Sequence, residues 1–355
     1  MTFWKGIACL AAAATMLYGC NGGGESSTPS TAPAKPTASG QGEKPKEFKI
    51  TMIAKSNNNP VFQKAKTGAE KAAEDLSKST GVKITIDWQT PETEDAQVQA
   101  DKIQQAVNNG SQAILLSCAD ATKVKGAISD AVDKNVPVMT FDSDAPDSKR
   151  FAFYGADDEK MGRDVMDNLA EAGKGQQLNV AILAGDQTAP NLQKRVKGVQ
   201  DEAKKYSNVK IVGVFNHVES PQDASAEVIK DNNARPEINA WAMIGGWPLF
   251  NTSLLSLDPA KYKIVAVDAL PAELEYVDKG ITPVLLAQPV YDWGYKSVGV
   301  IVDKLILKKE VPTVVEMKLI KVTKDNLGDW ARQLKAWGFD DVDPKFLAMP
   351  PAKKP

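Results

Sequence analysis

Short apolar runs alternate with amphipathic stretches from Phe48 onward, and this alternation constrains the fold more than any other feature. The apolar runs predict strands at 48–54, 82–88, 113–117, 136–141, 151–154, 178–183, 209–215, 240–244, 262–267 and 282–286. The stretches between them, such as 62–76, 96–107, 124–132, 160–172 and 293–307, carry apolar residues at helical spacing. Strands that alternate with helices of this kind predict βαβ units and parallel sheets covered by helices on both faces.

The strand–helix pattern is long enough for two separate units. The chain has 355 residues, and the pattern starts again near residue 150 with a second half of similar size. A single hydrophobic core rarely grows to that length. The sequence therefore predicts an α/β fold with two doubly wound lobes. Ligands of such sheets bind at the carboxyl ends of the strands.

The amino terminus carries an export signature. Lys5 precedes an apolar run at 6–18, which is too short for a bilayer that needs about 20 helical residues. The run ends in Leu17-Tyr18-Gly19-Cys20 and resembles a bacterial lipobox, which implies a lipoprotein signal peptide at 1–20 and acylation of Cys20. A plain signal peptide cut near Gly19 is the alternative.

The segment 21–47 is rich in Gly, Ser, Thr, Pro and Ala, and we interpret it as a flexible linker. A signal, a lipid and a linker predict that the folded part lies in the periplasm or on the cell surface, anchored to a bacterial membrane only through its lipid. We expect a monomer.

Composition argues against several classes of function. The formal net charge is −2 and no long basic run occurs, so we expect no nucleic-acid partner. His217 is the only histidine, which disfavours a histidine-based metal site or a catalytic triad. No phosphate-binding glycine motif follows a strand. We therefore expect no enzyme, no catalytic residue, no metal and no cofactor. Cys118 lies in an apolar run and is expected to be a buried, inert thiol.

The loops that follow the strands are rich in amides, carboxylates and aromatic rings. Asp accepts hydrogen bonds, Arg donates them through a rigid fork, and Asn and Gln do both, so together they can satisfy the hydroxyls of a desolvated sugar. An aromatic ring can pack against the apolar face of the same sugar. The candidate ligand-binding residues are Asn59, Phe62, Asp142, Asn191, Arg195, Trp247, Asp268 and Gln288.

Several of these loops, taken in order, resemble a known family. Asn58-Asn59-Pro60-Val61-Phe62, Thr140-Phe141-Asp142, the segment 191–198 with Arg195, Val267-Asp268 and Ala287-Gln288-Pro289 are similar to type I periplasmic sugar-binding proteins. The similarity is to the ribose- and galactose-binding branch and to the effector domains of LacI-type repressors, over about 48–322.

The resemblance implies two lobes joined by a three-strand hinge, with crossings near 155–157, 288–289 and 317–320. It places the first lobe at 48–155 and 289–317, and the second at 156–288 and 318–350. Hinge closure around a small sugar or polyol would produce the form recognised by the membrane permease of an ABC transporter.

The sequence departs from this family at several positions. Ser143 stands where ribose binders carry an arginine, and Gly245-Gly246 stands where other members have an Asn-Asp pair. Gln193 competes with Asn191 and Arg195 as the donor of its segment.

Each candidate also has a structural alternative. Asn59 can cap a helix, Phe62 can lie in the core, Trp247 can pack between loops, and Gln288 can belong only to the hinge. Asp142 and Asp268 can cap a turn or a helix, and Arg195 can form a surface pair with Asp201 or Glu202. Lys55 can reach the cleft or stay solvated, and Asp120 can border the site or cap the next helix.

Three other functions are compatible with part of the pattern. A sensor would present the closed form to a membrane receptor. A repressor is disfavoured, because an export signal and a linker precede the first strand where a DNA-binding domain would lie. A doubly wound enzyme is the third possibility.

The segment 326–338, with Leu327, Trp330, Leu334 and Trp337 on one face, predicts a helix packed on the second lobe.

Overall fold

The computed structural model describes residues 45–352, and within them the strands form two six-stranded sheets. The signal, the linker and Cys20 lie outside the described residues, except for the last few linker positions. The first sheet contains β1 (Glu47–Ile53), β2 (Lys83–Trp88), β3 (Ala113–Leu116), β4 (Val138–Phe141), β5 (Ala152–Gly155) and β11 (Val314–Glu316). Its order is β11-β5-β4-β3-β1-β2, and all of its pairings are parallel.

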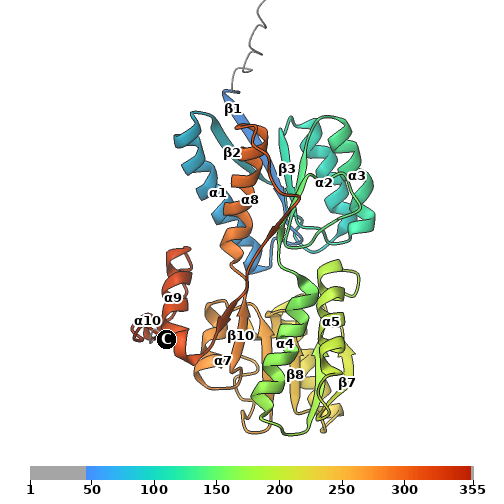
Figure 1. The fold of residues 1–355 in the computed structure, drawn as a ribbon, viewed down its shortest axis with the longest axis vertical. Helices are drawn as coiled ribbons and strands as arrows, with labels where there is room; N and C mark the ends of the chain where they lie inside the picture. The colour runs from blue at the N-terminus through green and yellow to red at the C-terminus, as the bar shows by residue number, and fades with distance from the viewer. Residues whose placement is uncertain (1–44, 353–355) are drawn as a thin grey trace, which may run out of the picture. The chain divides into compact units, whose positions relative to one another are not determined.

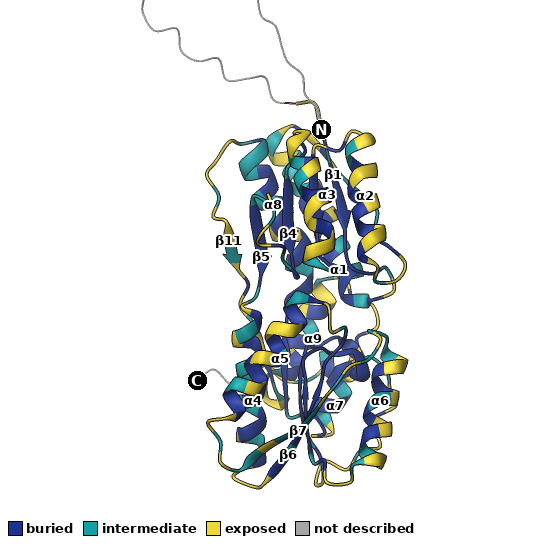
Figure 2. Cartoon of the chain, turned by 90° about the vertical axis from the view of Figure 1, so that its right-hand side faces the viewer, coloured by how far each residue is buried: buried dark blue, intermediate teal, exposed yellow. Residues whose placement is uncertain are grey.

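Helices cover both faces of this sheet, because successive side chains of each strand point to opposite sides. Ala113 and Leu115 pack with α1 (Pro60–Thr80) and α8 (Val290–Leu305), whereas Ile114 and Leu116 pack with α2 (Ala96–Asn108) and α3 (Ala121–Asp133). Cys118 is fully buried in the second of these layers, as predicted. Figure 2 shows buried strands between helices whose outer faces are exposed.

The second sheet has the order β12-β10-β9-β8-β6-β7. It contains β6 (Leu178–Leu183), β7 (Val209–Phe215), β8 (Ala240–Met243), β9 (Lys263–Val267), β10 (Val284–Ala287) and β12 (Ile320–Val322). The helices α4 (Asp158–Gly173) and α5 (Pro190–Ala203) pack against each other, and α6 (Pro221–Ala234) packs beside the 3-10 turn Trp247–Leu249. A short helix, α7 (Leu274–Asp278), follows β9. The predicted pair of doubly wound lobes is confirmed, except that β12 runs antiparallel to β10.

Each lobe contains one helix pair in close contact, and glycines make the contact possible. A Cβ at Gly294 of α8 would lie 1.9 Å from the Ala65 carbonyl oxygen of α1, and a Cβ at Gly68 would lie 2.0 Å from that of Tyr291. In the second lobe a Cβ at Gly162 of α4 would lie 2.0 Å from the Arg195 carbonyl oxygen of α5. Only glycine fits where two backbones approach this closely.

Three chain segments connect the lobes, following β5, β10 and β11 (Figure 1). The first and third are hydrogen-bonded, because Met317 N–H donates to the Gly155 carbonyl oxygen at 2.8 Å. The short strands β11 and β12 lie on either side of the third crossing, so this one segment adds an edge strand to each sheet.

The carboxyl-terminal segment contacts both lobes. It contains α9 (Leu327–Ala336) and α10 (Pro344–Leu347). Trp330 Nε1 donates to the Ala269 carbonyl oxygen of the second lobe at 2.7 Å. Trp337 stacks on Tyr291 of α8 with ring centroids 5.9 Å apart, and Lys64 Nζ donates to the Gly338 carbonyl oxygen at 2.7 Å. The prediction of a helix packed on the second lobe was therefore incomplete. Among the described residues, no helix has both the length and the apolar character to cross a membrane.

Candidate functional site

Asp142 and Asp268 occupy equivalent positions in the two lobes. Each follows a central strand and has a positive φ, 56° at Asp142 and 77° at Asp268. Each also donates its backbone N–H to the neighbouring strand, to Tyr154 and to Leu286, at 3.0 Å in both cases. Aspartate is among the few non-glycine residues that adopt this left-handed conformation readily. Both carboxylates therefore leave their strands through the same turn, at the carboxyl ends where ligands bind in such sheets.

Arg195 connects loops of the second lobe through three hydrogen bonds. Its Nε donates to Asp158 Oδ1 at 2.9 Å, its Nη1 to the Ile244 carbonyl oxygen at 3.1 Å, and its Nη2 to Gln288 Oε1 at 3.2 Å. Gln288 Nε2 in turn donates to Asp268 Oδ1 at 2.8 Å. All four side chains are buried. A surface pair of Arg195 with Asp201 or Glu202 is contradicted, because those two carboxylates pair with lysines.

This network gives Arg195, Asp268 and Gln288 fixed orientations. The Gly246 backbone N–H also donates to Asp268 Oδ2 at 3.2 Å. The hydrogen bonds show that Asp268 does not act merely as a helix cap and that Gln288 is bonded within the cluster. That these side chains contact a ligand stays a prediction.

The first lobe contributes Asp142 and a buried lysine. Ser117 Oγ donates to Asp142 Oδ2 at 2.7 Å. Lys55, which follows β1, is only 2% exposed, and its Nζ lies 3.0 Å from Glu94 Oε1 and 3.8 Å from Glu219 Oε1. Glu94 belongs to the first lobe and Glu219 to the second. The solvated alternative for Lys55 is therefore wrong.

The pKa values show that charges of both lobes act on one another. Burial raises the pKa of Asp142, while Lys55 and Arg195 act to lower it and Asp268 adds to the rise. Burial also raises the pKa of Asp268, which Gln288 and Arg195 oppose. Burial acts to lower the pKa of Lys55, but the carboxylates of Glu219, Glu94 and Asp142 outweigh it and the pKa is raised. The two lobes thus contribute to one electrostatic cluster.

Two carboxylates in this cluster have pKa values near neutral. Burial raises the pKa of Glu94 to about 7, although Lys55 opposes the shift. Burial raises the pKa of Asp158 to about 6, although Arg195 opposes it. Glu94, Glu219 and Asp158 were missed by the sequence analysis. The first two follow the outer strands β2 and β7, and Asp158 begins α4 just after a hinge crossing, so none lies in a loop that the strand pattern singled out.

Asn59 and Phe62 both have the structural role that the sequence allowed as an alternative: Asn59 caps a helix and Phe62 lies in the core. Asn59 Oδ1 accepts the Val61 backbone N–H at 3.2 Å and caps α1, whose first residue is Pro60. Phe62 is 3% exposed and packs against Phe141 and Trp293, with centroids 6.4 Å and 5.9 Å away. Capping leaves the amide nitrogen of Asn59 for a ligand. Asp120 likewise caps α3 through Thr122 and Lys123.

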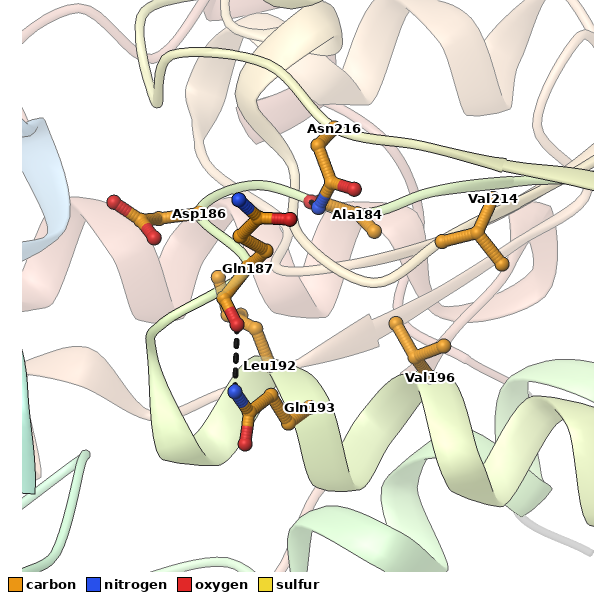
Figure 3. A pocket seen from close by; sticks show the side chains of 8 residues that line it. All are labelled: Ala184, Asp186, Gln187, Leu192, Gln193, Val196, Val214 and Asn216. Carbon is orange, nitrogen blue, oxygen red and sulfur yellow. Dashed lines mark hydrogen bonds between the residues drawn. The ribbon is translucent and has the colours of Figure 1, made fainter.

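Asn191 and Gln193 lie on different faces of α5. Asn191 is buried, and its Oδ1 has no hydrogen-bond partner among the described residues. Gln193 is exposed and donates to the Gln187 carbonyl oxygen at 2.6 Å. Figure 3 shows Gln193 in a separate cavity of about 200 Å³ within the second lobe, lined by Ala184, Asp186, Gln187, Leu192, Gln193, Val196, Val214 and Asn216. Gln193 is thus oriented away from Arg195.

A cavity of about 250 Å³ lies between loops of the two lobes. It is lined by Asn58, Asn59 and Pro60 of the first lobe and by Glu219, Ser220, Pro221, Gln222, Trp247 and Phe250 of the second. Trp247 is 5% exposed, and its ring lies against His217 with centroids 5.1 Å apart. Trp247 therefore both packs between loops and borders the cavity.

The donor set suits hydroxyl groups better than a metal ion. Within 45–352, no cluster of three His, Cys, Asp or Glu side chains has a geometry that could hold a metal. Carboxylates, amides and a guanidinium that face one another supply both donors and acceptors, which a polyol needs.

Curated relatives match parts of the chain. The ribose import binding protein of Bacillus subtilis is 30% identical over 171 residues, 48% of this chain, and the match spans about half (52%) of that protein's length. The ribose import binding protein of Escherichia coli is 26% identical over 285 residues, covering 76% of this chain and 90% of that protein.

Solved structures share the fold. The crystal structure of a glucose-galactose binding protein from Geobacillus stearothermophilus matches with a TM-score of 0.72 at 25% identity, covering 79% of this chain and 99% of that one. A solute-binding protein from Burkholderia graminis, in complex with D-arabinose, matches with a TM-score of 0.74 at 22% identity, covering 80% and 98%.

The family assignment rests on a match that covers most of the folded part of the chain. Residues 50–310, which are more than half of the chain, match the family described as periplasmic binding protein domain. That span runs from within β1 to just past α8 and includes every candidate ligand-binding residue. Members of this family work outside the cytoplasm. The chain belongs to the periplasmic binding protein family.

Proposed function

We propose that the chain is an extracytoplasmic solute-binding protein that captures a small sugar or polyol between its lobes by hinge closure and delivers it to the membrane permease of an ABC transporter. The observation that carries the proposal is the buried Arg195–Gln288–Asp268 network, whose charges act on Asp142 of the other lobe. A ligand bonded to both Asp142 and Asp268 would be shared between lobes, so its binding energy would favour the closed state.

The relatives support this choice of ligand and partner. Two are named ribose import binding proteins, and one fold neighbour holds D-arabinose. The word import in the names of these relatives favours a role in transport over the sensory alternative. Because buried hydrogen-bonding groups without partners cost about 1–3 kcal/mol each, a site built this way selects ligands whose hydroxyls match it. The proposal includes no catalytic step.

The proposal also assigns a role to each segment of the chain. The lobes comprise 48–155 with 289–317 and 156–288 with 318–350. Residues 1–20 are a lipoprotein signal, 21–47 a linker, and Cys20 the lipidated residue of a monomeric protein. Asn59, Asn191 and Trp247 complete the ligand-binding set, and Phe62 supports it from the core.

Calorimetry against a panel of pentoses, hexoses and polyols tests the function, with small-angle scattering before and after addition of each binder. We expect at least one ligand that binds and reduces the radius of gyration. Asp268→Asn should lower the affinity for that ligand at least ten-fold. Asp340→Asn, at a side chain that is 96% exposed, should leave the affinity unchanged. Absence of any binder, or binding without compaction, contradicts the proposal.

A further inference from the structure

The cleft has two parts with different chemistry. Asp142, Arg195, Asp268 and Gln288 form a buried, charged inner part, and none of them lines the 250 Å³ cavity between the lobes. That cavity is bordered instead by the rings of Trp247 and Phe250, the ring of Pro60, and amides and a carboxylate.

The two parts adjoin each other in the chain and in space. The backbone N–H of Gly246 donates to Asp268 in the inner part, and the next residue, Trp247, borders the cavity. Glu219 provides a second connection, since it lines the cavity and its Oε1 lies 3.8 Å from Nζ of Lys55, whose charge acts on Asp142 of the inner part. A group held in the cavity is therefore next to a group held by the inner part, and both lobes contribute to each.

The lining of the cavity fits a second ring. Aromatic and proline rings offer flat apolar faces, while Asn58, Gln222 and Glu219 offer polar groups at the edge. Pockets for drug-sized ligands measure about 300–1,000 Å³, so 250 Å³ accommodates one ring-sized group. Asn58 and Gln222 are exposed, which places them toward solvent.

We infer that the ligand of this site is a two-ring glycoside, either a disaccharide or a sugar with an apolar aglycone, with one ring in the Asp142–Arg195–Asp268–Gln288 part and the second in the cavity bordered by Trp247 and Phe250. This inference rests on the proposed sugar-binding function. Specificity for the second ring comes from apolar contact with Phe250 and Trp247 and from polar contacts with Asn58, Gln222 and Glu219.

Calorimetry with matched pairs tests the inference: each disaccharide or phenyl glycoside is compared with its free monosaccharide. We expect at least one two-ring compound to bind ten-fold or more tightly than its monosaccharide. Phe250→Ala should abolish that advantage while changing monosaccharide affinity less than two-fold, and Phe250→Tyr, which keeps the ring, should preserve it. Thermal unfolding confirms that each variant is folded.

The outcomes separate the two claims. If monosaccharides bind as tightly as every two-ring compound, or if Phe250→Ala weakens both members of a pair equally, the second-ring site is refuted and the sugar-binding function stands. If Phe250→Ala does not fold, Gln222→Ala at an exposed position replaces it, with the same selective loss expected for the two-ring compound. If no sugar of either size binds, the proposed function itself is refuted.

Discussion

Nζ of Lys55 in the first lobe lies 3.8 Å from Oε1 of Glu219 in the second, so an ion pair of the protein itself crosses the cleft. The same Glu219 oxygen accepts the Asp186 backbone N–H at 3.2 Å, which holds the glutamate in place. Lys55 is almost fully buried, so solvent screens the pair weakly. The protein therefore supplies a charged contact between the lobes from its own side chains.

Lys55→Met should shift the ligand-free protein toward an open state, because it removes the charge that both glutamates face. Small-angle scattering should show a larger radius of gyration than for the wild type. The free energy of unfolding should fall by about 1–3 kcal/mol, since Glu94 and Glu219 lose their shared partner. Lys83→Met, at a side chain 66% exposed, is the control and should change neither quantity. An unchanged radius for Lys55→Met would show that the pair does not govern closure.

Stability should decrease as pH rises between about 4.5 and 7. Burial raises the pKa of Glu94 to about 7 from its ordinary 4.5, so the folded protein binds the proton more tightly than the unfolded chain. The stabilisation from that proton is complete below pH 4.5 and is lost as pH passes 7. The pKa of Asp158 is raised to about 6, so this group adds a further loss of stability as the pH rises.

Urea unfolding at a series of pH values measures this dependence. Glu94→Gln should flatten the part of the curve between pH 5 and 7, whereas Glu92→Gln, at an exposed neighbour, should leave the curve unchanged. A Glu94→Gln curve parallel to that of the wild type would exclude Glu94 as the source.

Arg195→Lys should impair binding more than folding. A lysine carries one ammonium and cannot reach Asp158, the Ile244 carbonyl and Gln288 at once, as the guanidinium does. Gln288 and Asp268 would then lose their fixed orientation. We expect affinity for any sugar that binds the wild type to fall at least ten-fold by calorimetry. Lys194→Arg, at the exposed position beside it, should bind normally.

Gly162→Ala should disturb the same site from a distance. Its Cβ would lie 2.0 Å from the Arg195 carbonyl oxygen, so α4 and α5 must separate. Overpacking of this kind costs about 1–3 kcal/mol, and the shift moves Arg195. Gly126→Ala in α3, where a Cβ meets nothing within 4 Å, should instead stabilise the fold by about 0.5–1 kcal/mol. Equal melting temperatures for the two variants would contradict the close helix contact.

The Tyr291–Trp337 stack should couple α8 to the carboxyl-terminal segment. A double-mutant cycle with Tyr291→Ala and Trp337→Ala should give a coupling free energy of about 0.5–1.5 kcal/mol in urea unfolding. The rings lie nearly parallel, with an interplanar angle of 2°. A cycle with Trp337→Ala and Tyr206→Ala, at a ring bonded to Asp167 on α4, is the control and should show no coupling.

The strand pattern predicted most of both sheets because fully buried parallel strands appear as continuous apolar runs, such as 113–116 and 240–243. It predicted neither of the edge strands β11 and β12, since each is three residues long and has two exposed residues. The fold class was thus predictable from the sequence, whereas the short edge strands were not.

The positions of Asp142 and Asp268 were predictable, because each polar residue directly follows a central strand. The partners of those residues were not predictable. Arg195 faces Asp158 because of how α5 packs on α4, and sequence spacing alone equally allowed pairs with Asp201 and Glu202. The sequence could not decide whether Lys55 is buried or solvated. Its partner Glu219 lies more than 160 positions away along the chain, and only the fold brings the two together across the cleft.

The first lobe is assembled from two stretches of chain. Its last elements, α8 and β11, follow β6 to β10 of the second sheet in the sequence, and only the edge strand β12 of that sheet comes later. The glycine contact between α1 and α8 joins residues more than 220 positions apart. Contacts of such long range raise the contact order and slow folding. Neither lobe can therefore be cut out as one continuous fragment, and a newly made chain must keep β1 to β5 unfinished until nearly all of its length is available.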